Sequence, residues 1–276
     1  MNGLMAGKRG LVMGVANDHS IAWGIAKALS AAGAELAFTY QGEAFGRRVR
    51  PLAEEVGAKL LLPCDVEDEA SVDAVFAALK AEWGQLDFLV HAIGFSDKNE
   101  LKGRYADTTR ANFSRTMVIS VFSFTEVARK AAAMMTAGGS LLTLTYGGST
   151  RVMPNYNVMG VAKAALESSV RYLAADFGSE GIRVNAISAG PVRTLAGSGV
   201  TDARLMFNFQ KKNAPLKRTV TIDEVGRSAL YLLSDLSSGV TGEVHFVDSG
   251  YSIMSMPRID ELKEQDRRES AEGPTG

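Results

Sequence analysis

Residues 9–40 contain three consecutive segments, R-G-L-V-M-G (9–14), I-A-W-G-I-A-K-A-L-S-A-A-G (21–33) and E-L-A-F-T-Y (35–40). The first and third are short apolar runs of strand length, and the middle one carries apolar residues at helical spacing. A loop of mostly small residues joins the first strand to the helix. This order predicts a β-α-β unit at the start of the chain.

The same alternation continues along the chain. Further strands are predicted at 59–66, 86–93, 140–146, 182–189 and 243–247, and further helices at about 69–82, 107–136, 157–177 and 222–235. Strands that are apolar on both faces, each followed by a helix, indicate a parallel sheet covered on both sides. We therefore expect an α/β fold with one doubly wound, Rossmann-like sheet, and a ligand at the carboxyl ends of its strands.

The length and composition favour one large domain. The chain has 276 residues, of which 46% are hydrophobic, and no Pro- or Ser-rich linker divides it. We expect one Rossmann-type domain over 1–256, with a helical lid at about 192–215. Residues 257–276 are charged and almost free of large apolar side chains, so a disordered tail is predicted there.

The charge balance and the single cysteine exclude several classes of function. Thirty basic and thirty-one acidic residues give a net charge of −1, which offers no general attraction to nucleic acid or to a membrane surface. No apolar run has the length of a membrane span. Cys64 is the only cysteine, so no intrachain disulfide and no metal site are expected. With no signal-peptide pattern, the cytoplasm is the expected compartment.

Tyr146, Tyr156 and Lys163 are the candidate catalytic residues. Tyr156 and Lys163 are seven positions apart, about two helical turns, so both can reach one small ligand. A phenol can donate to an oxygen on which negative charge develops, while a fixed cation holds a cofactor and makes phenolate easier to form. The alternative is that Tyr156 only begins a helix and Lys163 extends to solvent.

The first two βα junctions carry candidate dinucleotide contacts. Gly14, Ser20 and Ile21 belong to a loop that opens onto a helix, where backbone amides can approach a pyrophosphate. The G-x-G-x-x-G spacing is absent, so an ordinary βα turn is an alternative, and Ser20 is also a candidate helix N-cap. Gln41 follows the second strand in place of an acidic residue. It can bond a ribose but offers no charge to a 2′-phosphate, so NADH is favoured over NADPH.

The third and fourth strands end in further candidates. Asp65 can accept from an adenine amino group and Val66 can pack on the ring, although Asp65 could equally satisfy free amides at a helix N-terminus. Gly94 would let the backbone approach a bound ribose. His91 lies inside an apolar strand, where a hydrogen-bonded core histidine is expected, with no catalytic role.

Five segments together resemble the bacterial NADH-dependent enoyl-acyl-carrier-protein reductases, a branch of the short-chain dehydrogenase/reductases. They are G-V-A-N-D-H-S-I-A-W-G-I-A, E-L-A-F-T-Y-Q, H-A-I-G-F, P-N-Y-N-V-M-G-V-A-K-A-A-L-E and R-V-N-A-I-S-A-G-P-V-R-T-L-A. The resemblance covers roughly residues 4–256. The six residues between Tyr156 and Lys163 match this branch rather than the Tyr-x-x-x-Lys of the wider group. Tyr146 stands where carbonyl-reducing relatives usually carry serine.

The resemblance implies the roles of individual residues. Tyr156 and Lys163 match the catalytic pair, and Tyr146 matches a tyrosine whose part in the family is debated. The implied cofactor-binding residues are Gly14, Ser20, Ile21, Gln41, Asp65, Val66, Ile93, Gly94, Lys163, Val192, Arg193, Thr194, Leu195 and Ala196. The implied substrate-binding residues are Ser96, Tyr146, Tyr156, Met159, Leu205 and Met206.

The implied activity is NADH-dependent reduction of the trans-2 double bond of an enoyl thioester carried by acyl carrier protein. In the lid, Leu195, Val200, Leu205, Met206 and Phe209 are expected on the inner side, unless the segment is an ordinary core helix. Arg204, Lys211 and Lys212 can meet an acidic carrier protein or can simply be a solvated basic face.

Two other functions remain open at this point: a carbonyl reductase or alcohol dehydrogenase of the same superfamily, and a non-catalytic NADH-binding module. Kinship also implies a homotetramer. The apolar faces of the helices at about 107–136 and 157–177 are candidate interfaces, although they could equally cover the sheet of a monomer.

Overall fold

A computed structural model describes residues 3–192, 203–260, 262, 263, 267 and 270. Within these residues one parallel sheet has seven strands in the order β3-β2-β1-β4-β5-β6-β7. The strands are β1 (Arg9–Met13), β2 (Glu35–Tyr40), β3 (Leu60–Pro63), β4 (Phe88–His91), β5 (Gly139–Thr145), β6 (Ile182–Ala189) and β7 (Val244–Val247). The strand order reverses between β1 and β4, so the predicted doubly wound fold is confirmed.

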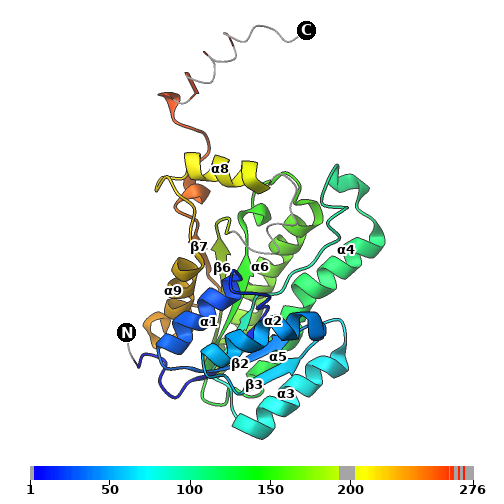
Figure 1. The fold of residues 1–276 in the computed structure, drawn as a ribbon, viewed down its shortest axis with the longest axis vertical. Coiled ribbons are helices and arrows are strands. Elements are labelled where there is room, and N and C mark those ends of the chain that lie inside the picture. The colour runs from blue at the N-terminus through cyan, green and yellow to red at the C-terminus, as the bar shows by residue number, and fades with distance from the viewer. Residues whose placement is uncertain (1–2, 193–202, 261, 264–266, 268–269, 271–276) are drawn as a thin grey trace.

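Helices cover both faces of the sheet (Figure 1). They are α1 (Ile21–Ala31), α2 (Gly42–Glu55), α3 (Glu69–Trp83), α4 (Arg110–Met117), α5 (Ser123–Ala132), α6 (Asn157–Phe177), α8 (Ala203–Asn213) and α9 (Ile222–Leu233). One core cluster joins the sheet to α3, α5 and α6, and the other joins it to α1, α2 and α9.

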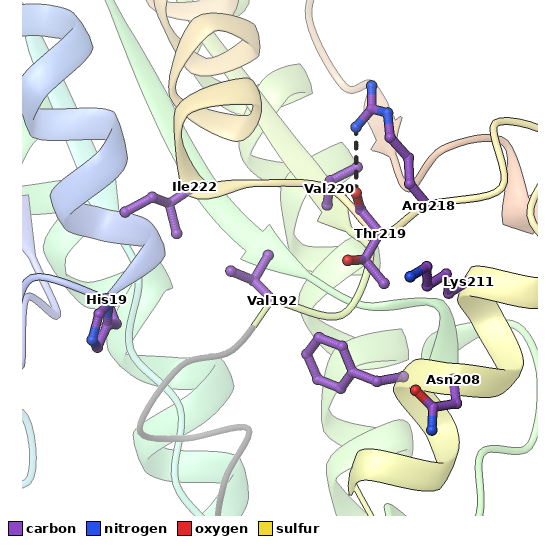
Figure 2. Close-up of a pocket in the computed structure, with 9 residues that line it drawn as sticks. His19, Val192, Asn208, Lys211, Arg218, Thr219, Val220 and Ile222 are labelled. Atoms are coloured by element: carbon purple, nitrogen blue, oxygen red, sulfur yellow. Dashed lines mark hydrogen bonds between the residues drawn. The ribbon is translucent and has the colours of Figure 1, made fainter.

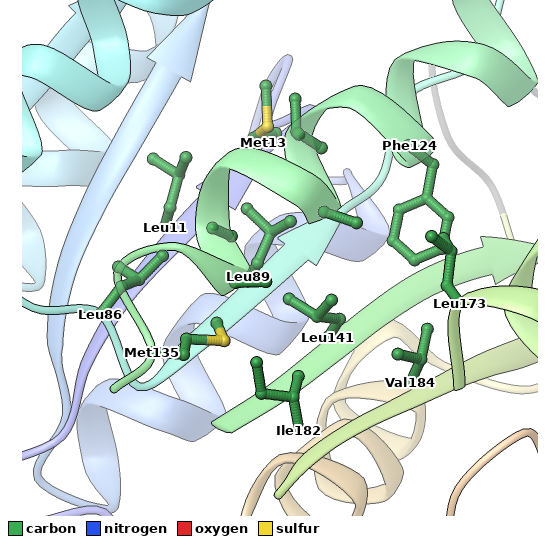
Figure 3. Packing of buried hydrophobic residues seen from close by; sticks show 14 of the residues in the cluster. Leu11, Met13, Leu86, Leu89, Phe124, Met135, Leu141, Leu173, Ile182 and Val184 are labelled. Carbon is green, nitrogen blue, oxygen red and sulfur yellow. The ribbon is translucent and has the colours of Figure 1, made fainter. Parts of the chain in front are cut away.

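Strand alternation sends neighbouring residues into opposite cores. Leu11 and Leu141 belong to the cluster under α3, α5 and α6 (Figure 3), whereas Val12 and Leu142 belong to the one under α1, α2 and α9. All four are fully buried, which contributes about 1.5–3 kcal/mol each. Burial on both faces is why these strands are apolar throughout.

Close packing of α1 on α9 requires two glycines. A Cβ at Gly24 would lie 2.4 Å from the carbonyl oxygen of Ile222, and one at Gly226 would lie 2.4 Å from the carbonyl oxygen of Gly24. Both distances are far below van der Waals contact. The helices can therefore approach this closely only because neither position carries a side chain.

Helix α2 was not predicted from the sequence, because Gly42, Gly46 and Pro51 hide its pattern. Its buried face is Gly46, Val49 and Ala53, a helical spacing that becomes apparent only once the β-α order is known. The helix predicted at 107–136 is divided by a π-helical segment, Val118–Phe122, between α4 and α5. The tail predicted at 257–276 lies mostly outside the described residues.

Candidate active site

A cavity of about 480 Å³ opens at the carboxyl ends of the strands, where their order reverses. We call it the central cavity. The predicted site residues that line it are Gly14, Ser20, Ile21, Ile93, Gly94, Ser96, Tyr146, Tyr156, Met159, Lys163, Val192 and Met206. Residues separated by almost two hundred positions thus meet at one edge of the sheet, as the topology predicts.

Tyr156 stands at the N-cap position of α6 and meets Tyr146 edge to face, with ring centroids 5.2 Å apart. Burial raises the pKa of Tyr156, and the neighbouring Tyr146 raises it further. The expected help of Lys163 in forming phenolate does not set the net shift, because desolvation of the phenolate dominates. At neutral pH Tyr156 is a neutral phenol that can donate a hydrogen bond.

The backbone on both sides of Tyr156 adopts the left-handed region. Asn155 has φ 56° and Asn157 has φ 35°, and asparagine tolerates this region better than most residues. The Asn157 side-chain amide donates to the carbonyl of Glu100 at 3.2 Å, and to those of Lys102 and Gly103 at 3.4 Å. Strained backbone of this kind is concentrated at functional sites. Here it fixes the direction in which the Tyr156 side chain points into the cavity.

Lys163 is buried, and its ammonium donates to the carbonyl of Leu144 at 2.9 Å, so the alternative of an amine extended to solvent is wrong. Burial lowers its pKa to about 8, partly opposed by Glu167 one turn further along α6. Glu167 is itself buried and accepts from the Thr145 hydroxyl at 2.6 Å. Glu167 was missed in the sequence, although its spacing of four from Lys163 was an available signal.

The loop after β1 presents the positive end of α1 to the central cavity. The Ser20 hydroxyl accepts from the amides of Ala16 and Asn17 at 3.0 and 3.1 Å and makes no side-chain cap bond to α1. Ser20 is therefore the N-cap residue of α1, as predicted, but its hydroxyl orders the preceding loop instead of capping the helix. A Cβ at Gly14 would lie 2.1 Å from the Ala92 carbonyl oxygen, so a glycine is required there for packing as well.

Gln41 and Asp65 lie beside each other outside the central cavity. The Gln41 amide donates to an Asp65 oxygen at 3.1 Å, and the other Asp65 oxygen accepts from the Glu67 amide. The side-chain cap of α3 is Asp68, which accepts from Ala70, so Asp65 satisfies a free amide ahead of the helix without being its cap residue. Val66 packs against the core. These residues form an exposed polar edge at the ends of β2 and β3.

Gly94 faces the Lys163 ammonium: a Cβ there would lie 3.7 Å from Nζ, an ordinary contact. Packing within the protein thus does not require glycine, and the space is free for a ligand. Ser96 next to it accepts from the side-chain amide of buried Asn112 at 3.1 Å. Ser120, on the π-helical segment, accepts from the Phe95 amide at 2.9 Å. Asn112 and Ser120 were not identified from the sequence.

His91 is a core residue, as predicted. Its ring nitrogens contact the hydroxyls of Thr143 at 3.1 Å and Ser123 at 2.9 Å, and it is fully buried. Burial lowers its pKa to about 3. His91 is therefore neutral at physiological pH and is not among the residues that line the central cavity.

Helix α8 faces the central cavity with Met206 and Phe207. Leu205 and Phe209 were also predicted on the inner side, but they are 67% and 54% exposed and do not line this cavity, because they lie on other faces of the helix. The predicted contacts at Arg193, Thr194, Leu195 and Ala196 and the inner position of Val200 lie outside the described residues.

Two further cavities adjoin helix α8. One of about 450 Å³ (Figure 2), the α8 cavity, is lined by His19, Val192, Phe207, Asn208, Lys211, Arg218, Thr219, Val220 and Ile222. Arg218 is paired with Glu224 at 2.6 Å. The other, of about 370 Å³, we call the C-terminal cavity, and its lining includes Tyr146, Gln210, Asp248 and Tyr251. Tyr146 thus borders both the central and the C-terminal cavity.

No helix in the described part of the chain has the length and apolar character needed to cross a membrane. The described residues also contain no group of three or more His, Cys, Asp or Glu side chains arranged to hold a metal ion. Among the described residues that line the central cavity, the polar side chains are hydroxyls and the ammonium groups of Lys98 and Lys163.

Comparisons with known proteins agree with this geometry. The family model described as enoyl-(acyl carrier protein) reductase matches residues 14–252. Enoyl-[acyl-carrier-protein] reductase [NADH] 2 of Rhizobium meliloti is 76% identical over 96% of this chain and 99% of its own length.

Two solved structures are similar throughout. The crystal structure of FabI from Candidatus Liberibacter asiaticus has a TM-score of 0.92 and 60% identity, covering 94% of this chain and 100% of that one. The enoyl-(acyl-carrier-protein) reductase of Anaplasma phagocytophilum, solved in complex with NAD, has a TM-score of 0.91 and 59% identity, covering 94% and 99%. The predicted resemblance is confirmed, and this chain belongs to the enoyl-(acyl carrier protein) reductase family.

Proposed function

We propose that this protein uses NADH to reduce the trans-2 double bond of an enoyl thioester carried by acyl carrier protein, a step of fatty-acid elongation. When bound, NADH would supply a hydride to the β-carbon of the thioester and become NAD⁺, and a proton added at the α-carbon would complete the reduction. Negative charge develops on the thioester oxygen before that proton is added, and the central cavity holds a neutral phenol, Tyr156, suited to that oxygen. This half-buried phenol, neutral and lining the cavity, is the observation on which the proposal rests.

Tyr156 acts as the hydrogen-bond donor to the developing enolate oxygen. The bond becomes stronger as charge builds, so it stabilises the transition state more than the ground state. One such donor in a desolvated site typically contributes about 3 kcal/mol. Because burial raises its pKa, Tyr156 keeps its proton until the charge on the substrate develops.

Lys163 and the loop after β1 hold the cofactor. Lys163 binds the hydroxyls of the nicotinamide ribose, in the space that Gly94 leaves open beside its ammonium. The positive end of α1 receives the pyrophosphate. Gln41 and Asp65 bind the adenosine end, where the Asp65 carboxylate beside Gln41 opposes the charge of a 2′-phosphate and so favours NADH.

A direct comparison of substrates tests the proposal. The purified protein is mixed with NADH and either a trans-2-enoyl or a 3-ketoacyl thioester, and nicotinamide absorbance is followed. We expect oxidation of NADH with the enoyl thioester alone. Turnover with the ketone alone would favour the carbonyl reductase, and NADH binding without turnover of either would favour the non-catalytic module.

Acyl carrier protein is the proposed partner, and the basic residues of α8 are its proposed contact. Arg204, Lys211 and Lys212 are exposed, and Lys211 lines the α8 cavity beside the central one. The double variant K211E/K212E should raise the KM for carrier-protein thioesters and leave that for thioesters of small thiols unchanged. Lys80→Glu on α3 is the matched control. An equal rise for both substrates would contradict docking on α8.

We also propose a homotetramer in the cytoplasm. Large apolar side chains are exposed along α4, the π-helical segment and α6, among them Phe122 at 59% and Tyr172 at 73%. Covering them in an interface removes this apolar surface from water. Light scattering should give the molar mass of four chains for the unmodified protein and a smaller mass for the F122D/Y172D variant. A monomeric unmodified protein would refute the tetramer.

A further inference from the structure

A hydrogen bond joins helix α8 to Tyr146. The Gln210 side-chain amide donates to the Tyr146 hydroxyl oxygen at 2.9 Å, and Gln210 is only 4% exposed. A glutamine buried to this extent is held by its hydrogen bonds, because burying an unpaired amide is costly. Its partner is one of the three candidate catalytic residues.

The cavities that Gln210 and Tyr146 line show from which side the bond reaches the phenol oxygen. Gln210 lines the C-terminal cavity but not the central one, whereas Tyr146 lines both. The Gln210 N–H therefore reaches the phenol oxygen from the side away from the central cavity. A phenol oxygen that accepts on one side has its own proton available on the other. That side includes the central cavity and Tyr156, whose ring centroid is 5.2 Å away.

Helix α8 also meets the residues that follow β7. Phe209 meets Tyr251 edge to face at 6.5 Å, and the buried atoms Asn213 Oδ1 and Ser249 Oγ have no hydrogen-bond partner. The Gln210 bond also opposes the effect of burial, which raises the pKa of Tyr146. Among the described residues of α8, Gln210 is thus the one whose side chain hydrogen-bonds to a candidate catalytic group.

We propose that Gln210 is a positioning residue: it accepts no proton itself but orients the Tyr146 hydroxyl so that Tyr146 donates into the central cavity, toward the bound acyl thioester. The inference rests on the proposed function. It also couples the position of α8 to the donor geometry of the site, since Gln210 can make its bond only when α8 is packed against Tyr146.

A double-mutant cycle tests the proposal. Gln210→Met keeps the length of the side chain and removes its donor, so it should lower kcat/KM for the enoyl thioester by about fivefold, the effect of one neutral hydrogen bond. The loss should fall on kcat more than on KM, and the Kd for NADH should stay unchanged. In the Y146F background Q210M should have no further effect, because its target is gone.

Phe209→Ala is the control, because it weakens the packing of α8 without touching Tyr146. Its effect should be the same with and without Y146F. Three results would each overturn the proposal. Q210M could lower kcat/KM equally in both backgrounds, Y146F alone could keep full activity, or Q210M could keep full activity. Turnover by the unmodified protein is measured first, so failure of the proposed function is distinguished from failure of this inference.

Discussion

Replacing Lys163 with methionine should change stability in a way that depends on pH. The pKa of Lys163 falls from 10.5 to about 8 on folding, because its ammonium is buried. That fall corresponds to a cost of about 3 kcal/mol for holding the charge in the folded protein. Lys163→Met removes this cost but leaves the Leu144 carbonyl without its donor, which costs about 1–3 kcal/mol.

The sign follows from proton binding. Between pH 8 and 10.5 the unfolded chain still holds the Lys163 proton while the folded protein has lost it, so stability of the unmodified protein rises with pH in that window. The methionine variant gains nothing there. Its free energy of unfolding, relative to the unmodified protein, should therefore fall by about 3 kcal/mol across the window.

The assay is urea unfolding followed by tryptophan fluorescence at several pH values in this window. The lost hydrogen bond to Leu144 contributes nearly equally at every pH, so the pH dependence isolates the charge. Lys80→Met changes an exposed lysine of α3 and serves as the control, which should show no such trend. If the free energy of unfolding of K163M minus that of the unmodified protein stays constant or rises with pH, the buried-ammonium argument is refuted.

Three further changes test other parts of the structure. Tyr156→Phe should lower kcat/KM about 100-fold with the Kd for NADH unchanged, and weakened NADH binding would contradict its assignment to the substrate. Gly226→Ala should destabilise the fold by about 1–3 kcal/mol, since its Cβ would lie 2.4 Å from the Gly24 carbonyl oxygen. Gly239→Ala is the control: its Cβ would have no atom within 4 Å, so it should unfold like the unmodified protein. The urea midpoint of each variant gives the measurement. We expect NADH affinity to be lost at alkaline pH as Lys163 loses its proton. Glu167→Gln should move this loss to lower pH, because Glu167 raises the pKa of Lys163. A fluorescence titration of NADH binding against pH whose midpoint does not move would contradict this.

The sheet could be predicted because its strands are buried on both faces. Apolar runs such as Leu141 and Leu142 have no solvent face, and the helices between them force parallel pairing. Helix α2 could not be predicted, because its helical pattern is carried by a glycine, a valine and an alanine around Pro51. Its stability comes from packing on the sheet, which local propensity does not report.

The sequence predicted which residues form the site but only partly how their side chains are oriented. The topology dictates that residues after β1, β4 and β5 converge, and the predicted residues there line one cavity. The bonds that orient them are not encoded at short range: Gln210 reaches Tyr146 across 64 positions, and Asn112 reaches Ser96 across 16. Nor did residue type reveal burial, which reversed the expected direction for the pKa of Tyr156.

Tyr156 and Lys163, the candidate catalytic pair, lie in one cavity where desolvation shifts the pKa of each so that its neutral form is favoured. Desolvation raises the pKa of Tyr156 and lowers that of Lys163 to about 8, since it penalises phenolate and ammonium alike. Of these two groups, Lys163 is therefore the one whose charge changes close to physiological pH. Glu167, whose carboxylate accepts a hydrogen bond from Thr145, opposes that loss of charge. The ammonium that we propose to bind the cofactor is thus kept charged in part by a carboxylate one helical turn away.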